Sequence, residues 1–383
     1  MKRVVMFAGP YHPIPPIKGA AVETWIYEVS KRLIKYHPYI ISIGSPFYPK
    51  KEFKEGIFFY RINFGRVYKR VFQKFLRWDI YSYFDRIFKY INKIKPDIIH
   101  IHNYLEIGKL IKRIKKNFPQ TKIILHMHNI KKINFYLEID ACVGVSNFIT
   151  EYYRNIFKTS CFHTIYNGVD ISRFLKSRFA GVKNKFKENV FQKNIFYIGR
   201  ISPEKGVDKI VKLADLCKDK KDWKFFCVGE ISQKGERAKY YKKLLKFIEE
   251  KKIKNIEFWD WISPSKIHYV YSLADLVIIP SQFEEPFCMV ALEAMASKVP
   301  IIAAEKGGMK EYLIHNKNAI VIKDYNNFEK IAKKYLEKMF EDRVFTNKII
   351  KNAFETVKQK FDWQKIAIEV ENFYDSLLKE EFR

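Results

Sequence analysis

The stretch "PSQFEEPFCMVALEAMASKVPIIAAEKGG", residues 280–308, decides the fold class. It opens at the Pro that closes one short apolar run and ends in a second apolar run that is closed by two Gly residues. Between the runs lie a loop with two neighbouring acidic residues and a helical pattern from Met289 to Ser297. A buried strand, a loop, a helix and another buried strand in this order predict one unit of a parallel α/β sheet.

Glu293 is unusual in this stretch because it lies among apolar neighbours on the predicted helix. A second acidic residue, Glu285, ends the preceding loop, and a helix rise of about 1.5 Å per residue puts the two at most about 12 Å apart. The backbone N–H groups of Phe287, Cys288 and Met289, at the helix start, are free to bind hydroxyl or phosphate oxygens. Taken alone, Glu293 would belong to an ordinary helix salt bridge.

The same alternation of short apolar runs and helical patterns extends over most of the chain. Helical patterns include Glu23–Tyr36 and Ile80–Lys95, and after Asn326 the pattern is helical only. Periodicity is lost within residues 174–194, so we expect two doubly wound parallel-sheet domains in series. The runs that predict strands are RVVMFAG, YIISIGSP, DIIHIHN, KIILHMHN and ACVGVSN in the first half, and NIFYIGR, WKFFCVGE, NIEFWDW, DLVIIPS, PIIAAE and NAIVIKD in the second.

Length and composition agree with two domains. The 383 residues are 48% hydrophobic and 16% aromatic, which is enough apolar material for two cores. Five scattered cysteines without a C-x-x-C pair argue against a disulfide framework or a zinc cage. No run of 18 apolar residues occurs, and Pro10 interrupts the N-terminal run too early for a signal peptide, so we expect a cytoplasmic protein.

Charge is the strongest compositional feature, with 71 Lys and Arg against 42 Asp and Glu and a formal net charge of +29. Such a protein attracts anions, which makes nucleic acid, anionic lipid and phosphorylated metabolites eligible partners. Residues 57–78 contain no acidic side chain, and residues 66–78 form a basic amphipathic pattern at helical spacing. This segment predicts either peripheral contact with an anionic membrane or a core-packed helix with a solvated basic face.

The loop in "YIGRISPEKG", residues 197–206, follows the first predicted strand of the second half. Gly199 ends the strand, Arg200 and Lys205 bring two cations, and Gly206 precedes a helix. A helix N-terminus next to cations suits a phosphate or a diphosphate. The spacing is not that of a Walker loop.

Two H-x-H pairs end strands that we expect to be neighbours. His100 and His102, like His126 and His128, are spaced to project from one face of a strand, so four imidazoles could converge on a transition metal. The alternative is that they are core residues with hydrogen bonds to the backbone. No D-x-D motif is present, and we expect no metal.

Several segments together resemble the group 1 (GT4) retaining glycosyltransferases of GT-B fold. The family's hallmark is a pair of Glu separated by seven residues, here Glu285 and Glu293. The N-terminal "PPIKGAAVETWIYEVSKRL" is most similar to spore-coat and surface-polysaccharide members. The matching segments are YIGRISPEKG, YSLADLVIIPSQFEEPFCMVALEAMASKVPIIAAEKGGMKEYL, KGAAVETWIYEVSKRL, IYNGVDISRF and FDWQKIAIEVENFY.

The resemblance implies an α/β fold with two Rossmann-like, doubly wound parallel-sheet domains that face each other across a cleft. Residues 1–175 would form the N-terminal acceptor-side domain and residues 176–360 the donor-nucleotide domain. Residues 361–383 would form a C-terminal helix that packs back on the N-terminal domain.

The resemblance also implies an activity. The enzyme would move a hexose-type sugar from a UDP- or GDP-sugar to a hydroxyl of a glycan or lipid-linked acceptor, with retained configuration, in surface polysaccharide biosynthesis. It would need no cofactor and no metal, and it would work in the cytoplasm, at the inner face of the membrane if residues 66–78 meet lipid. Nucleic acid is not an expected partner.

Individual roles follow from the same resemblance. Arg200 and Lys205 would hold the donor diphosphate and stabilise the leaving nucleotide. Glu293 would accept hydrogen bonds from the ribose hydroxyls. Glu285, together with the amides of Phe287, Cys288 and Met289, would hold the transferred sugar.

Two N-terminal residues complete the expected site. Gly19, in the loop after the first strand, would let the backbone approach the donor phosphate or the acceptor. His128 would touch the donor sugar at the reacting centre. The chain departs from the family pattern at Cys288, where Gly is common, and at Ala20, which replaces the second Gly of a pair.

Two functions from other classes stay open at this point. A sugar-nucleotide epimerase of GT-B fold would share the nucleotide site but would isomerise the sugar without an acceptor. A basic nucleic-acid-binding protein would show steep salt dependence towards DNA or RNA.

Overall fold

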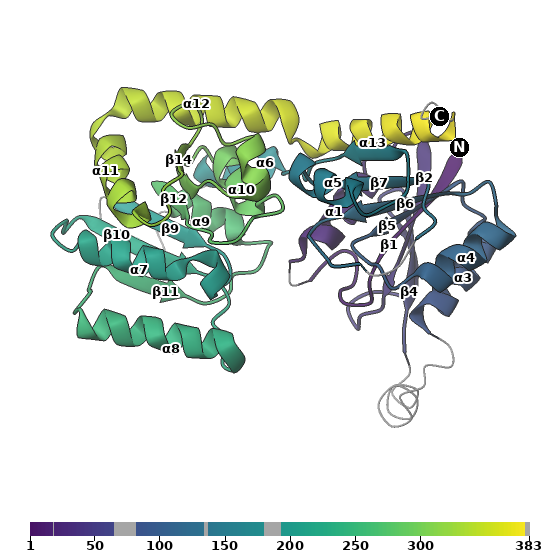
Figure 1. Ribbon diagram of the computed structural model, residues 1–383, viewed down its shortest axis with the longest axis horizontal. Coiled ribbons are helices and arrows are strands. Elements are labelled where there is room, and N and C mark those ends of the chain that lie inside the picture. The colour runs from purple at the N-terminus through teal and green to yellow at the C-terminus, as the bar shows by residue number, and fades with distance from the viewer. Residues whose placement is uncertain (18, 65–81, 134–136, 180–192, 380–383) are drawn as a thin grey trace. The chain divides into compact units, whose positions relative to one another are not determined.

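The computed structural model describes residues 1–17, 19–64, 82–133, 137–179 and 193–379. The chain forms two compact units. Unit 1 consists of Met1–Asn167 with Trp363–Arg383, and unit 2 consists of Gly168–Asp362. Each unit is an α/β sheet covered by helices (Figure 1). The expected roles of residues 1–175 and 176–360 in acceptor and donor binding stay predictions.

The described part of unit 1 contains a sheet in the order β3-β4-β2-β1-β5-β6-β7-β8. Its neighbouring strands are parallel except for the antiparallel pair β3 and β4. The strands are β1 (Lys2–Ala8), β2 (Tyr36–Ile43), β3 (Lys51–Lys54), β4 (Ile57–Ile62), β5 (Ile98–His102), β6 (Lys122–Met127), β7 (Ala141–Gly144) and β8 (Cys161–Thr164). The helices are α1 (Ala21–Ser30), α3 (Tyr83–Ile94), α4 (Gly108–Asn117), α5 (Asn147–Arg154) and α13 (Trp363–Leu378).

Helix α3 shows how local sequence sets an element in unit 1. Ser82 begins it with a capping box, in which the Ser82 hydroxyl accepts from the Asp85 amide and the Asp85 carboxylate accepts from the Ser82 amide. Ile87, Ile91 and other apolar side chains at helical spacing are buried. Lys95 ends the helix in a left-handed conformation.

Unit 2 contains an all-parallel sheet in the order β11-β10-β9-β12-β13-β14 among its described residues. The strands are β9 (Lys193–Ile198), β10 (Trp223–Val228), β11 (Ile256–Trp259), β12 (Leu276–Ile279), β13 (Ile301–Ala304) and β14 (Ile320–Ile322). The helices are α6 (Ile171–Phe179), α7 (Val207–Leu216), α8 (Gly235–Glu250), α9 (Ile267–Leu273), α10 (Met289–Ala296), α11 (Phe328–Glu341) and α12 (Arg343–Lys360), with 3-10 turns η4 (Pro203–Lys205) and η5 (Gly307–Glu311).

The last helix, α13, belongs to the first unit, as expected. Its buried Trp363 and Val370 lie in the same apolar cluster as Trp25 of α1 and Val4 of β1. Polar contacts fix it further, because one Glu371 carboxylate oxygen accepts from the backbone amides of Ile34 and Lys35, at 2.6 Å each. The hydroxyl of Tyr374 lies 2.6 Å from His100 Nδ1 inside the core.

Three details of unit 1 differ from the sequence expectations. The helix expected at Glu23–Tyr36 ends at Ser30, and Tyr36 is the first residue of β2. The acid-free segment 57–78 begins with strand β4, which pairs with β2 and β3 and was not among the expected strands. Strands β3 and β8 were not expected, because residues 51–54 are polar and residues 161–164 are short.

The proposed membrane segment, residues 66–78, lies outside the described residues. Among the residues that the structure describes, no helix is both long enough and apolar enough to span a bilayer.

Replacing Tyr374 by Phe tests the docking of α13 on unit 1. The substitution removes the partner of a fully buried imidazole nitrogen, so the free energy of unfolding should fall by about 1–3 kcal/mol. Urea denaturation followed by tryptophan fluorescence measures it. Tyr39→Phe, at a half-buried tyrosine whose ring stacks on Phe58, is the matched control and should unfold like the wild type. Equal midpoints for both variants would contradict the account.

Candidate active site at the switch point of unit 2

The order of the strands in unit 2 selects one edge for ligand binding. Strand β9 pairs with β10 on one side and β12 on the other, so the strand order reverses between β9 and β12. In open parallel sheets, ligands bind outside the carboxyl ends of the strands at such a switch point. The two loops that leave this point are residues 199–206 after β9 and residues 280–288 after β12.

An ion pair between Lys205 and Glu285 joins these two loops. Lys205 Nζ lies 2.7 Å from Glu285 Oε1, and the Ser281 hydroxyl donates to the same oxygen at 2.5 Å. Glu285 is buried and Lys205 is half-buried. The ammonium also lies 4.8 Å from the centre of the Phe283 ring. The structure thus brings together two residues that are 80 positions apart and were both predicted for the site.

Two glycines allow the loops to approach this closely. Gly206 has φ +70, and a Cβ at this position would lie 2.0 Å from the carbonyl oxygen of Pro280. Gly307 has φ +49, and its Cβ would lie 2.1 Å from the carbonyl oxygen of Glu285. Both positions therefore require glycine, because they combine a left-handed backbone with direct backbone contact.

Helix α10 begins at Met289, and its N-cap residue Cys288 lies three positions after Glu285. Cys288 has φ 82, a left-handed backbone conformation that favours glycine. This conformation explains why Gly is common at this position in the family, although this chain has Cys. The Cys288 carbonyl and that of the buried Phe287 both accept from the Tyr312 hydroxyl, at 3.1 Å and 2.6 Å. Tyr312, the residue that directly follows η5, therefore holds the turn at Phe287 and Cys288 in place.

Glu293 lies one turn further along α10 and is bound to a tyrosine. The Tyr271 hydroxyl donates to Glu293 Oε2 at 2.8 Å, so the partner is a phenol rather than the cation of a helix salt bridge. Burial raises the pKa of Glu293 to about 7, while the Tyr271 hydrogen bond and the charge of Arg173 act in the opposite direction. Arg173 itself donates to His268 Nδ1 at 3.4 Å and to the carbonyl of Pro264. The pKa of the Glu293 carboxyl therefore lies near physiological pH.

Arg200 is the most accessible of the predicted site residues in unit 2. Its side chain is 51% exposed, and its guanidinium lies 3.8 Å from the Glu204 carboxylate. The Arg200 carbonyl accepts from the Tyr197 hydroxyl at 2.6 Å, so the backbone is fixed while the side chain is available to a ligand. Gly19 and His128, the other two predicted residues, belong to unit 1.

Gly19 and His128 both occupy the carboxyl edge of the unit 1 sheet. Gly19 has φ 73 and lies immediately before Ala20, the N-cap of α1. His128 follows β6 and is 8% exposed. Burial lowers its pKa to about 3, so the imidazole is neutral at physiological pH.

The four histidines do cluster, as their spacing predicts. They surround Trp25, with His102 Nδ1 3.2 Å from His128 Nε2. His100 is bound to Tyr374 rather than to the backbone. Ring nitrogens of His100, His102 and His126 lie within 4.8 Å of one another. The metal alternative and the expectation of no metal both stay predictions.

Sequence reasoning missed three residues of this site: Ser281, Tyr271 and Arg173. Ser281 directly follows the strand-closing Pro280, which is the one local signal that it faces the site. Tyr271 and Arg173 come from α9 and α6, and only the packing of these helices against α10 brings them to Glu293.

Comparisons with known proteins match this architecture. A family model described as glycosyl transferases group 1 matches residues 181–356, and one described as glycosyltransferase family 4 matches residues 22–173. The chain is 30% identical over 374 residues to the lipopolysaccharide 1,2-N-acetylglucosaminetransferase of Salmonella typhimurium, covering 96% of each protein. It is 22% identical to spore coat protein SA of Bacillus subtilis, covering 97% of this chain and 99% of that protein.

Solved structures share the fold at low sequence identity. Sucrose-phosphate synthase from Thermosynechococcus elongatus superposes with a TM-score of 0.78 at 17% identity, covering 99% of this chain and 100% of the other. Anabaena HepE in complex with UDP and glucose superposes with a TM-score of 0.72 at 18% identity, covering 98% of this chain and 100% of the other.

The elevated pKa of Glu293 predicts a pH-dependent stability that Glu293→Gln removes. The ordinary value is 4.5 and the folded value is about 7, so the folded protein favours the protonated carboxyl. The stability contributed by this proton is complete below pH 4.5 and is lost as the pH rises through 7, by about 3 kcal/mol at most.

Urea denaturation of both proteins between pH 4.5 and pH 8.5 checks this expectation. Glu293→Gln should match the wild type at pH 4.5 and exceed its stability at pH 8. The control Glu249→Gln, on the exposed face of α8, should follow the wild type throughout. A constant difference between Glu293→Gln and the wild type at every pH would contradict the assignment.

Proposed function

The chain belongs to the group 1 glycosyltransferases, with the GT-B fold, and from this premise we propose which transfer it catalyses. A hexose-type sugar moves from a UDP- or GDP-sugar to a hydroxyl of a glycan or glycolipid acceptor in surface polysaccharide biosynthesis. The Salmonella relative, which acts on lipopolysaccharide by its name, supports the acceptor class. The HepE structure with UDP and glucose supports a nucleoside diphosphate donor.

The observation that carries the proposal is the Lys205–Glu285 pair at the switch point of unit 2. Breaking the bond between sugar and diphosphate leaves negative charge on the departing nucleotide, and stabilising it is the largest electrostatic task of the reaction. Lys205 offers a half-buried ammonium between two loops whose close approach requires Gly206 and Gly307. Arg200 offers an accessible guanidinium in the same loop as Lys205. On binding, the donor diphosphate takes its place beside these two cations.

Glu285 and Glu293 hold the two ends of the donor in this proposal. Glu285, with the amides of Phe287, Cys288 and Met289, binds hydroxyls of the transferred sugar at the start of α10. Glu293 binds the ribose, because an ionised carboxylate accepts hydrogen bonds from both hydroxyls of the diol. Tyr271 orients that carboxylate from the opposite side. Cys288, in place of a glycine, narrows the sugar pocket.

Retention of configuration is proposed to need no nucleophile from the protein. The Glu285 oxygen that faces Lys205 already receives two hydrogen bonds, from the ammonium and from Ser281, and both lower its nucleophilicity. In a same-face attack, the departing phosphate takes the proton of the acceptor hydroxyl as the new glycosidic bond forms. His128 is neutral through burial, so its proposed role at the donor sugar is that of a hydrogen-bonding group rather than of an acid.

We also propose that no metal takes part in the transfer, since Lys205 and Arg200 supply the positive charge that a divalent cation supplies elsewhere. The reaction is placed in the cytoplasm, at the inner face of the membrane. The net charge of +29 and the acid-free residues 57–78 support attraction to anionic lipid.

Steady-state kinetics with UDP- and GDP-hexoses and core oligosaccharides released from lipopolysaccharide test the proposal. Lys205→Ala should lower kcat by about 100- to 1,000-fold, since it removes charge stabilisation in the transition state. Glu293→Ala should raise the donor KM by about 10-fold, the equivalent of about 1.4 kcal/mol of binding. Proton NMR should find that the new linkage keeps the anomeric configuration of the donor.

The matched control is Lys212→Ala on α7, an exposed lysine paired with Asp208. Its kinetics should equal those of the wild type. Wild-type kinetics in Lys205→Ala and Glu293→Ala would refute the roles of these residues, an inverted product would refute retention, and isomerised donor without transfer would indicate an epimerase.

A further inference from the structure

Unit 1 has a switch point of its own. Strand β1 pairs with β2 on one side and with β5 on the other, and β5 continues the sheet towards β6. The loops that follow β1 and β5 therefore diverge at the carboxyl edge, where a parallel sheet of this kind binds ligands. Residues 9–20 follow β1, and residues 103–107 follow β5.

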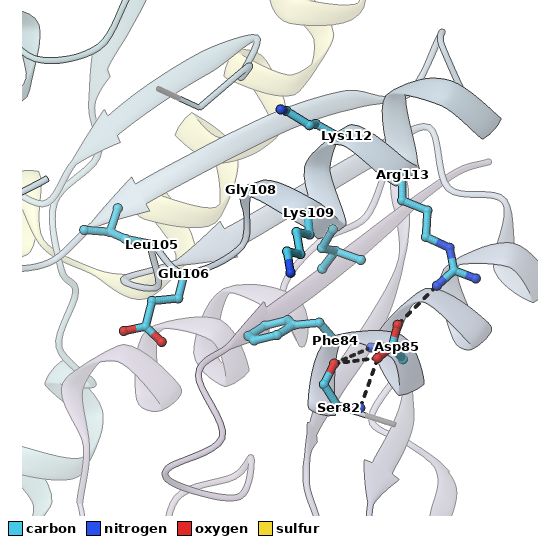
Figure 2. A pocket seen from close by; sticks show the side chains of 10 residues that line it. Ser82, Phe84, Asp85, Leu105, Glu106, Gly108, Lys109, Lys112 and Arg113 are labelled. Atoms are coloured by element: carbon cyan, nitrogen blue, oxygen red, sulfur yellow. Dashed lines mark hydrogen bonds and ion pairs between the residues drawn. The ribbon is translucent and has the colours of Figure 1, made fainter. Parts of the chain in front are cut away.

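A pocket of about 660 Å³ opens beside the second of these loops. It is formed by the start of α3, the loop after β5 and the first two turns of α4, all within unit 1 (Figure 2). Its volume is in the range of about 300–1,000 Å³ that small-molecule sites occupy. Among the residues that line it, Phe84, Glu106, Lys109, Asp85 and Arg113 offer the chemistry that follows.

Three aromatic rings connect the two loops with the pocket. The Tyr104 ring lies 5.0 Å from that of Phe84 and 6.3 Å from that of Tyr11, between ring centres. Tyr11, in the loop after β1, is 67% exposed. A Cβ on Gly9 would lie 2.5 Å from the Tyr104 ring and 2.7 Å from the Tyr11 ring, so a glycine at this position makes the aromatic row possible.

Five charged side chains line the pocket: Asp85, Glu106, Lys109, Lys112 and Arg113. Arg113 and Asp85 pair with each other at 3.2 Å. Glu106 accepts from the Tyr104 hydroxyl at 3.2 Å, which leaves its second carboxylate oxygen for another donor. Figure 2 shows Lys109 of α4, Phe84 of α3 and Glu106 of the loop after β5 lining the same pocket. Lys109 also lies in the first turn of α4, where the helix dipole favours an anion.

We propose that this pocket binds an anionic saccharide, the acceptor of the transfer, with its sugar ring on Phe84 and its phosphate or carboxylate at Lys109. The apolar C–H face of a pyranose stacks on an aromatic ring, and its hydroxyls donate to a carboxylate such as that of Glu106. A flat aromatic surface, a carboxylate and an ammonium within one pocket match these three parts of the ligand. This inference rests on the proposed function and deepens it by naming the acceptor class.

Binding to the full chain is measured first, with glucose 6-phosphate, glucose and inorganic phosphate as probes in saturation-transfer NMR titrations. The titrations use Lys205→Ala protein, so that the proposed diphosphate site does not compete for phosphate. Glucose 6-phosphate should bind at least about 10-fold more tightly than either glucose or inorganic phosphate, because only it contacts both Phe84 and Lys109. Equal affinity for inorganic phosphate would reveal general anion binding only and would overturn the proposal.

Substitutions of pocket residues test whether glucose 6-phosphate binds in this pocket. Lys109→Gln should weaken glucose 6-phosphate about 10-fold and leave glucose unchanged, and Phe84→Ala should weaken both sugars. Lys116→Gln removes an exposed lysine further along the same helix and outside the pocket, and should bind like its parent. Unchanged affinity in Lys109→Gln would overturn the proposal, and this variant keeps it falsifiable if Phe84→Ala fails to fold.

The transfer assay separates this inference from the proposed function. In an otherwise wild-type chain, Lys109→Gln should raise the KM for a phosphorylated acceptor about 10-fold and leave the donor KM and the slow hydrolysis of the donor by water unchanged. A wild-type chain that turns over no nucleotide sugar would refute the proposed function instead. Normal acceptor kinetics in Lys109→Gln, with an active wild type, would refute the acceptor site alone.

Discussion

The ion pair between half-buried Lys205 and buried Glu285 is the constraint on which the candidate site depends. Burying two charges is unfavourable unless close contact and further hydrogen bonds compensate for lost hydration, and here a 2.7 Å contact and the Ser281 hydroxyl do so. The contact requires the loops after β9 and β12 to touch, which explains the two glycines, Gly206 and Gly307, at points of backbone contact. In the proposed function the same ammonium also binds the donor diphosphate, so that one geometry would serve both stability and binding.

In both units the strand order reverses once, and ligands of parallel sheets bind at the carboxyl edge of such a point. The side chains at this edge differ between the two units. In unit 2 the edge carries two cations and two carboxyl groups that suit a nucleoside diphosphate sugar. In unit 1 it carries aromatic rings, a glutamate and a lysine that suit an anionic sugar. The histidine cluster beneath the unit 1 edge is neutral, because burial lowers the pKa of His100 and His128 to about 3. It packs around Trp25 and joins α13 to the sheet through Tyr374.

Much of the fold could be predicted, because apolar runs closed by Gly, Pro, Asn or Ser are local signals of buried strands. Lys205, Glu285 and Glu293 could be named for a similar reason, since each lies in a loop or helix directly after such a strand. The partners Ser281, Tyr271 and Arg173 could not, because tertiary packing alone brings α6, α9 and α10 together. The end of α1 at Ser30 was missed because the apolar spacing continues into β2, where pairing with β1 overrides it.

A thermal-shift titration of the wild-type chain with UDP, GDP and ADP in the absence of metal tests directly whether unit 2 binds a nucleoside diphosphate. A ligand that binds only the folded state raises the melting temperature in proportion to RT ln(1 + [L]/Kd). One nucleoside diphosphate should raise the melting temperature progressively with concentration. The corresponding nucleoside monophosphate, which lacks the phosphate expected at Lys205, should raise it far less. No shift with any of the three, in folded protein, would contradict a diphosphate site at Lys205 and Glu285.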